Sequence, residues 1–133
     1  MDIRTHHSLD SELCGTPEAV GDGAASVRMV PGPRMRADEH DLVHGGFVFG
    51  LADHAAMLAV NEPTVVLGAA DLRFVAPVTV GQQVVASARV TETKGKKHMV
   101  EVEVRADETV VLTGTLTCFV PPRHVLAPKE ETS

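Results

Sequence analysis

The residues best placed to do chemistry lie in one segment, His44 to Asn61, which reads HGGFVFGLADHAAMLAVN. Asp53 stands within a nearly continuous apolar run, where an ionised carboxylate is rare without a partner because its desolvation is costly. His54 is no simple partner, because neighbouring residues of a helix point about 100° apart. Asp53 is therefore a candidate nucleophile or general base, unless it pairs with Arg or His or meets water at the helix edge.

The two glycines that open the segment are suited to stabilising the negative charge that develops on a carbonyl oxygen when a nucleophile attacks it. The first N–H groups of a helix have no partner inside it, and the helix dipole places about half a positive charge there. Gly45 and Gly46 would let a carbonyl oxygen approach this backbone and would stabilise its developing charge. A plain tight turn is the competing interpretation. His44 would orient the loop or touch the substrate, or simply cap the helix.

The spacing of Gly45 and Asp53 has a consequence for assembly. They are eight residues apart in the chain, which along one helix corresponds to about 12 Å. One carbonyl carbon cannot contact both at bonding distance. If both act in one reaction, Asp53 must come from a second copy of the chain, across a two-fold axis that makes the helices antiparallel. The spacing therefore predicts a homodimer with two equivalent sites.

The element that must position these residues is a single long helix. Residues 44–61 predict it, with the glycines at its start and with Asn61 and Pro63 at its end. Apolar residues occupy every face of this segment, which is typical of a buried helix. Upstream, AASVRMV (Ala24–Val30) predicts a strand that Pro-Gly-Pro halts, and RADEHDL predicts a charged loop.

Four strand-like runs follow the helix: Thr64–Val78, Gln83–Thr93, His98–Asp107 and Thr109–Val120. Short links predict that successive strands are antiparallel neighbours, and the alternation in VEVEVR indicates one buried and one wet face. We expect one α+β domain over residues 1–133, in which a sheet curls around the helix or shares it with a second subunit. Residues 1–23 are expected to be loosely structured, with room for a short strand or turn, and residues 121–133 to form a frayed tail.

Composition narrows the function classes. The chain has 133 residues, 44% of them hydrophobic, with a net charge of −6 and only four aromatic residues, all Phe. The acidic balance and the scarcity of aromatics argue against nucleic-acid binding. Cys14 and Cys118 are interpreted as free thiols. No run approaches the roughly 18 apolar residues that span a bilayer, and no signal core opens the chain, so a cytoplasmic protein without a membrane partner is expected.

The helix segment, followed by DLRFVAPVTVGQQVVASARV, resembles the hotdog-fold acyl-CoA thioesterases. Within them it is most similar to the phenylacetic-acid-degradation subfamily, which is 4-hydroxybenzoyl-CoA thioesterase-like. The signature is His-Gly-Gly, then Leu-Ala-Asp in the helix, then a strand that ends in an aromatic-x-x-Pro and a Gly turn. The resemblance implies a hotdog fold, with a curved antiparallel sheet around the central helix, strands joined across a homodimer, and dimers often paired into a homotetramer.

The resemblance also implies hydrolysis of an acyl-CoA thioester, with no metal and no cofactor beyond the coenzyme A of the substrate. The family's carboxylate falls on Asp53, and its carbonyl-polarising N–H falls on Gly45. The chain departs from the family in two places. Several members carry Asn or Gln shortly before His-Gly-Gly, where this chain has Asp38 with His40 nearby. Some relatives carry Ser or Thr on the strand after the helix, near Ala69–Ala70 here.

Coenzyme A would also need cations for its phosphates. The main basic cluster is the loop of Lys94, Lys96 and Lys97, which is a phosphate-binding candidate or a solvated hairpin turn; Arg73, Arg123 and His124 are further candidates. His40 and His44 are four residues apart with acids between them. A metal-binding pair at that spacing needs both inside a helix, whereas His44 only begins one, so no metal site is expected.

Two other functions are compatible with this scaffold. One is a hotdog hydratase acting on enoyl-CoA thioesters, although the Asp-x-Asn-Pro-x-His type of segment that such enzymes resemble is absent from the sequence. The other is a non-catalytic module that binds acyl-CoA or an acyl carrier, since a fold does not determine a function. The acyl group is not specified by the residues. Ala52, Ala55, Ala56 and Met57 are suited to lining a pocket or to packing the helix.

Overall fold

The computed structural model describes residues 1–128, and the predicted long helix lies at its centre. Helix α2 runs from Gly45 to Val60, with His44 at the N-cap position and Asn61 as the C-cap. Asn61 is left-handed (φ 52°, ψ 40°) and its N–H bonds to the Met57 carbonyl, so this residue ends the helix as predicted.

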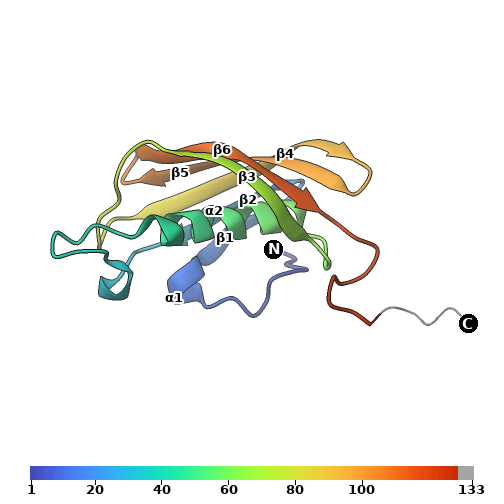
Figure 1. Ribbon diagram of the computed structural model, residues 1–133, viewed down its shortest axis with the longest axis horizontal. Coiled ribbons are helices and arrows are strands. Elements are labelled where there is room, and N and C mark those ends of the chain that lie inside the picture. The colour runs from blue at the N-terminus through green and yellow to red at the C-terminus, as the bar shows by residue number, and fades with distance from the viewer. Residues whose placement is uncertain (129–133) are drawn as a thin grey trace, which may run out of the picture.

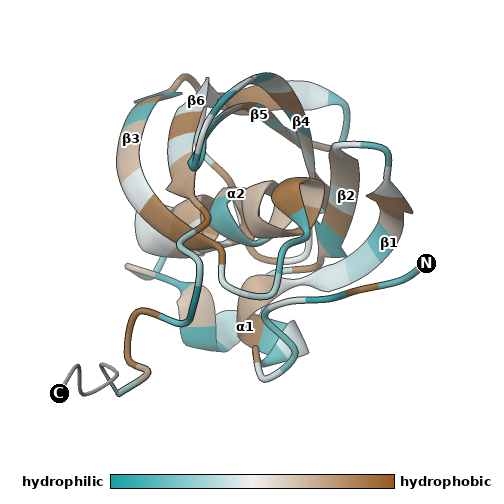
Figure 2. Ribbon diagram, turned by 90° about the vertical axis from the view of Figure 1, so that its right-hand side faces the viewer, coloured by the Kyte–Doolittle hydropathy of each residue, from teal (hydrophilic) through white to brown (hydrophobic). Residues whose placement is uncertain are grey.

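One six-stranded antiparallel sheet wraps around α2. It consists of β1 (Thr16–Gly21), β2 (Ala24–Met29), β3 (Val66–Phe74), β4 (Val84–Lys94), β5 (Lys97–Ala106) and β6 (Thr109–Phe119), in the order β1-β2-β4-β5-β6-β3. The sheet arches over α2 from β3 on one side to β1 on the other (Figure 2). The short helix α1 (Ser11–Cys14) lies on the opposite side of α2 from this arch (Figure 1). The predicted α+β class is confirmed.

The core fills the space between α2 and the concave face of the sheet. Along β5, Val100, Val102 and Val104 are buried, while the intervening residues point away from the helix. The small or flexible residues in the middle of α2 are all buried in the core as well: Ala52, Ala55, Ala56 and Met57. These four therefore pack the helix within its own chain and do not line an open pocket.

The predicted meander of four strands is only partly correct. β4, β5 and β6 are successive neighbours, but β3 pairs with β6, and β2 takes the place beside β4. The connection 75–83 is not a hairpin, because it crosses to the segment before α2. There the Val43 N–H bonds to the Val78 carbonyl (2.8 Å), and the Val80 N–H bonds to the Asp41 carbonyl (3.0 Å). β3 is consequently an edge strand.

The first 23 residues are more ordered than predicted, because they contain α1 and the whole of β1. The sequence obscured β1 because an edge strand with few buried side chains lacks a clear alternation of apolar and polar residues. Asn61 fixes the start of the chain: its Oδ1 accepts from the Arg4 N–H (2.8 Å), and its Nδ2 donates to the Asp2 carbonyl (2.7 Å). Residues 121–128 form no helix or strand, and the rest of the predicted tail, 129–133, lies outside the described residues.

Candidate active site

One side of α2 is not covered by its own chain. Apart from Phe47, the partly or fully exposed positions of its first two and a half turns share one stripe, as helical spacing allows: Gly45, Gly46, Phe49, Gly50 and Asp53. The expectation of a helix buried on every face is therefore wrong for a single chain. The two glycine positions and the carboxylate that the sequence singled out all lie on this uncovered stripe.

Asp53 is the acidic residue of this stripe, and its side chain lacks a partner in the described part of the chain. Its Oδ1 is buried and has no hydrogen-bond partner among residues 1–128, and no ion pair of those residues includes it. Burial raises the pKa of Asp53 to about 6. Burial also raises the pKa of the nearby Cys118 thiol to about 12, with a smaller contribution from the charge of Asp53. Such a carboxylate is poised to exchange a proton near neutral pH.

His54 does not neutralise Asp53. The residue is only 5% exposed, and its Nδ1 lies 2.9 Å from the Cys14 carbonyl oxygen. A carbonyl oxygen only accepts, so Nδ1 carries the proton in this bond. The bond ties α1 to α2. Cys14 and Cys118 are both free thiols, as predicted.

The turn into α2 presents two free amides. Gly45 is the first helical residue, and neither its N–H nor that of Gly46 has an acceptor within residues 1–128. His44 makes no capping bond with its side chain; its ring lies against Gly46 instead, with Cδ2 3.2 Å from the position of a Cβ there. The His44 N–H bonds to the Met35 carbonyl (2.9 Å) and fixes the turn. The amides at this positive end of the helix can receive a carbonyl oxygen.

Sequence reasoning missed one neighbour of this turn. Phe74, the last residue of β3, places its Cε1 3.6 Å from the position of a Cβ on Gly45. The aromatic-x-x-Pro signal marked the end of a strand. No pattern in the sequence indicated that this strand end returns to the start of α2.

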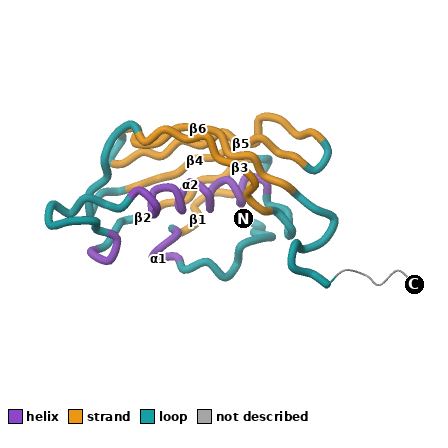
Figure 3. Tube along the Cα trace, in the orientation of Figure 1, coloured by secondary structure: helices purple, strands orange, loops and turns teal. Residues whose placement is uncertain are grey.

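The acidic loop before α2 is organised by Asp38. Its Oδ1 accepts from the backbone N–H groups of His40 (2.9 Å) and Leu42 (3.3 Å). His40 is exposed on this loop, and His44 lies at the helix start, so the two do not share a helix face. The loop lies at the end of the molecule where α2 begins, together with the connection 75–83 (Figure 3).

The predicted phosphate-binding lysines lie at the end of the molecule opposite the start of α2. Lys94 and Lys97 pair across the β4–β5 hairpin, with Lys96 in its turn. Beside them, Thr93 and His98 line a hollow together with the last turn of α2. That end is about 24 Å from Gly45 along a helix of 16 residues. Arg73 is exposed near the end of β3, next to Phe74, so this candidate cation, unlike the three lysines, lies at the same end of the molecule as Gly45.

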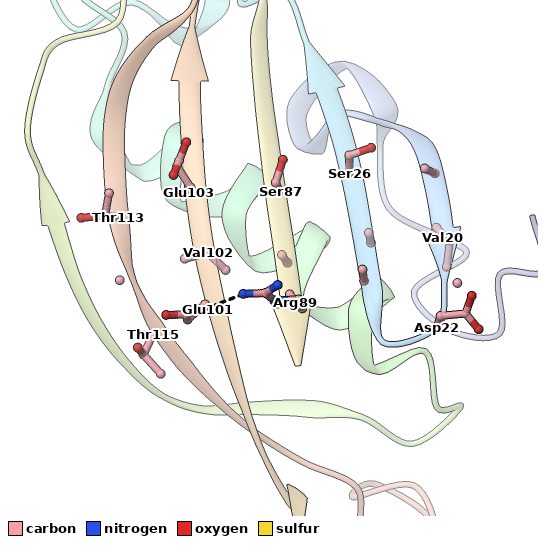
Figure 4. A pocket seen from close by; sticks show the side chains of 16 residues that line it. Val20, Asp22, Ser26, Ser87, Arg89, Glu101, Val102, Glu103, Thr113 and Thr115 are labelled. Carbon is pink, nitrogen blue, oxygen red and sulfur yellow. Dashed lines mark ion pairs between the residues drawn. The ribbon is translucent and has the colours of Figure 1, made fainter. Parts of the chain in front are cut away.

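A wide groove of about 950 Å³ lies on the face of the sheet turned away from α2 (Figure 4). Its polar lining includes Ser26, Ser87 and Thr115, and its charges include Arg89 and Glu101, which pair at 3.6 Å. No residue of α2 lines this groove. Within residues 1–128 no three His, Cys, Asp or Glu side chains gather to hold a metal ion, and no helix is long and apolar enough to cross a membrane.

Comparison with known proteins identifies the family. The sequence profile of the thioesterase superfamily matches residues 40–113, which is more than half of the chain. A methylthioribose-1-phosphate isomerase of Aquifex aeolicus is 49% identical over 114 residues, and a transcription factor FapR of Caldanaerobacter subterraneus is 26% identical over 91. These matches cover 86% and 68% of this chain but only 25% and 46% of those proteins, so the chain spans less than half the length of either relative.

Solved structures agree with the profile. An uncharacterised protein of Pyrococcus horikoshii superposes with a TM-score of 0.94 at 51% identity, covering 96% of this chain and 98% of that one. A variant of the phenylacetic acid degradation protein PaaI of Thermus thermophilus gives 0.74 at 28% identity, covering 82% and 96%. The likeness to PaaI is the weaker of the two, so the subfamily stays a prediction. The wrapped sheet, the helix motif and the profile together show that the chain belongs to the thioesterase superfamily and has its hotdog fold.

Proposed function

We propose that this protein hydrolyses acyl-CoA thioesters in sites shared by two copies of the chain. The observation that supports this most directly is Asp53, a carboxylate with a buried, unpartnered oxygen and a pKa raised to about 6. It lies on the same uncovered stripe of α2 as the free Gly45 amide. A strongly perturbed acid beside an electropositive turn is typical of a catalytic site, and membership of the superfamily indicates the reaction class.

The two groups act together only across a dimer. α2 is continuous from Gly45 to Val60, so Gly45 and Asp53 of one chain are about 12 Å apart along the helix. Two features support close approach of a second chain. Gly50, midway along the stripe, has no atom of residues 1–128 within 4 Å of its Cβ position, and β3 is an edge strand with Ala69 and Ala70 exposed. An antiparallel pair of β3 strands would continue the sheet and bring one Asp53 to the other chain's Gly45. Two such dimers would form the tetramer that the resemblance implies.

In the proposed reaction the thioester carbonyl oxygen accepts a hydrogen bond from the Gly45 N–H, and the Gly46 N–H and the helix dipole support it. The ionised Asp53 of the partner chain either attacks the carbonyl carbon or takes a proton from a water that attacks it. The carbon–sulfur bond then breaks, and the sulfur of coenzyme A leaves as a thiol after taking a proton, from the protonated Asp53 in the base route or from solvent in the nucleophilic route. In the nucleophilic route a water then hydrolyses the acyl anhydride, and in both routes the acyl group departs as a free acid. His44 and Asp38 hold the turn and the loop in place, and His40 lies on that loop at the edge of the site.

A single turnover in ¹⁸O-labelled water tests the nucleophilic role of Asp53. A nucleophilic carboxylate forms an acyl anhydride, and label enters Asp53 when water attacks the aspartyl carbon. Attack on the acyl carbon, like general-base catalysis, labels the acid product alone, so label in Asp53 identifies the nucleophile.

The coenzyme A phosphates are assigned to Lys94, Lys96, Lys97 and Arg73. The lysines and Gly45 lie at opposite ends of one chain, so the lysines take part only where subunits meet. Replacing the three lysines by Gln should raise KM with little change in kcat, because phosphate contacts at a distance from the carbonyl contribute equally before and during the reaction.

The test of the proposed function is release of free thiol from a panel of acyl-CoA esters by the purified protein. Asp53→Asn should lower kcat at least about a hundredfold. Gly45→Pro should do the same, because it removes the N–H that polarises the carbonyl. Proline suits this first helical position, the preceding His44 is already extended (φ −61°, ψ 129°), and a Cβ on Gly45 makes only ordinary contact with Phe74. Full activity in either variant would contradict the proposal.

A second candidate is a non-catalytic acyl-CoA binding module. The FapR relatives favour it, because they are transcription factors and the chain matches less than half of their length. The isomerase named for the Aquifex protein is a weaker lead, because three quarters of that protein lie outside the match. A binding module would release no thiol from any ester of the panel, and its Asp53→Asn variant would bind acyl-CoA as tightly as the wild-type chain does.

A further inference from the structure

The aromatic residues of this chain are concentrated at the start of α2. The chain has four Phe and no Trp or Tyr. Phe47 and Phe49 lie on the first turns of the helix, and Phe74 reaches the same turn from the end of β3. Core packing within one chain does not account for Phe74, whose surface is 56% exposed in the single chain. A large apolar side chain exposed beside free amides is well placed to contact a ligand.

The contact between Phe74 and the turn is specific. Its Cε1 and Cδ1 lie 3.6 and 3.8 Å from the position of a Cβ on Gly45, so the ring covers one side of that residue. The ring of His44 covers the neighbouring Gly46, and His44 in turn packs edge-on against Phe47, with ring centroids 6.2 Å apart. The rings of Phe74 and His44 therefore lie against the two glycines that open α2.

The backbone holds Phe74 in this place. Phe74 pairs with Leu112 in β6, and the next N–H, that of Val75, bonds to the Val111 carbonyl (2.8 Å). A side chain on a paired strand keeps its position better than one on a loop. A paired strand thus sets the place from which the Phe74 ring reaches the turn.

We propose that Phe74 selects the acyl group: the acyl carbons lie against its ring while the carbonyl oxygen bonds to the Gly45 N–H. This inference rests on the proposed function. A carbonyl held at Gly45 leaves the first carbons of the acyl chain within reach of the ring, and burial of apolar carbons against it is favourable in proportion to their area. The substrates that fit against this ring are thioesters of apolar acyl groups longer than acetyl. Phe74 is a positioning residue, since it does not touch the atoms that exchange bonds.

The kinetic test compares kcat/KM for hexanoyl-CoA with kcat/KM for acetyl-CoA. We expect this selectivity ratio to fall at least about tenfold in Phe74→Ala and by less in Phe74→Leu, because leucine restores part of the apolar surface. The matched control is Phe119→Ala. Phe119 is also exposed and also covers a glycine, Gly68, but it lies at the opposite end of β3. Its loss should leave the ratio unchanged. An equal loss of activity on both esters in Phe74→Ala would overturn the inference, since it would indicate a purely structural role.

A binding measurement separates this inference from the proposed function. The probes are two non-hydrolysable thioethers, 2-oxoheptyl-CoA and 2-oxopropyl-CoA, which keep a carbonyl but offer no scissile bond. If the wild-type chain hydrolyses nothing but prefers the longer probe, and Phe74→Ala loses that preference, the proposed function fails and the role of Phe74 stands. If the wild-type chain shows no preference, if Phe74→Ala retains it, or if neither probe binds, the role of Phe74 is refuted.

Discussion

Two regions of the molecule are candidate ligand sites, and they differ in whether their charged and polar groups have partners. The groove on the outer face of the sheet has a volume of about 950 Å³, and two of its ionic groups, Arg89 and Glu101, pair at 3.6 Å across neighbouring strands (Figure 4). The uncovered stripe of α2 carries groups that nothing in the described chain satisfies: the buried Asp53 Oδ1 and the Gly45 N–H.

This difference indicates that polar groups without a partner identify a functional site better than the volume of a hollow does. An exposed ion pair such as Arg89–Glu101 contributes about 0–1 kcal/mol and indicates a solvated surface. A carboxylate that is desolvated without a partner destabilises the fold, and proteins retain such groups where function offsets the loss. The α2 stripe is therefore the catalytic candidate, although the groove is the more conspicuous hollow.

The largest expected effect contrasts carboxylates from the two regions. Asp53→Asn should lower kcat/KM for acyl-CoA hydrolysis by a factor of about 10² to 10⁴, because it removes the base or nucleophile. Glu101→Gln removes the same charge from the outer groove and should change kcat/KM by less than about twofold. Steady-state thiol release measures both. Comparable losses in the two variants would remove the distinction between the regions.

The next largest effect tests whether the uncovered stripe of α2 is the dimer interface. Gly50→Glu should yield monomers and lower activity at least about tenfold, because a charged side chain would enter the space that the partner helix needs. The variant should fold, since no atom of the described part of the chain lies within 4 Å of the Cβ position of Gly50 and glutamate is the better helix former. Light scattering after gel filtration gives the mass. Gly21→Glu, also at an unobstructed glycine but on β1, is the control and should stay associated and active. A Gly50→Glu variant that remains dimeric would place the interface elsewhere.

A smaller effect is the pH dependence of activity. The pKa of Asp53 is raised to about 6, and the reaction needs the ionised form. Below that pH, kcat/KM should therefore fall about tenfold per unit, and above it the profile should level off. A profile that is flat between pH 5 and 7, with its midpoint near the ordinary aspartate value, would show that Asp53 is not the titrating group.

The smallest effect is on stability. The pKa of Asp53 is higher in the folded chain (about 6) than its ordinary value of 3.8, so its protonation stabilises the fold below pH 4 and that contribution is lost as the pH rises through 6. At pH 8, Asp53→Asn should accordingly be more stable than the wild-type chain by about 1–3 kcal/mol. Urea unfolding at pH 8 and pH 4 checks this, and the gain should shrink at pH 4. An equal gain at both values would assign it to a cause other than the buried charge.

The helix and most strands could be predicted from the sequence because their signals are local. The glycines at the start of α2, Asn61 at its end and the alternation along β5 act within a few residues, and the structure has each where it was expected. The place of β3 beside β6 could not be predicted, because it depends on a loop that bonds to Val43, more than 30 residues earlier in the chain. Local periodicity carries no information on such a pairing.

For the candidate site, the sequence indicated the residues but not their surroundings. Asp53 stood out because its type conflicts with its neighbours, and Gly45 because a glycine at a helix start leaves a free backbone N–H open to a ligand. Phe74 and the bond from His54 to Cys14 could not be found in this way, because both are contacts between segments distant in the chain. The uncovered side of α2 was hidden by its apolar composition, which does not distinguish burial within one chain from burial between two.

The most direct test of the shared site is to mix two inactive variants, Asp53→Asn and Gly45→Pro, in equal amounts under conditions that exchange subunits. Random pairing makes half of the dimers mixed, and each mixed dimer has one site with an intact Gly45 from one chain and an intact Asp53 from the other. Shared sites therefore predict recovery of about a quarter of the wild-type kcat. If exchange is verified by mass spectrometry and the mixture remains as inactive as its components, amide and acid do not meet across two chains.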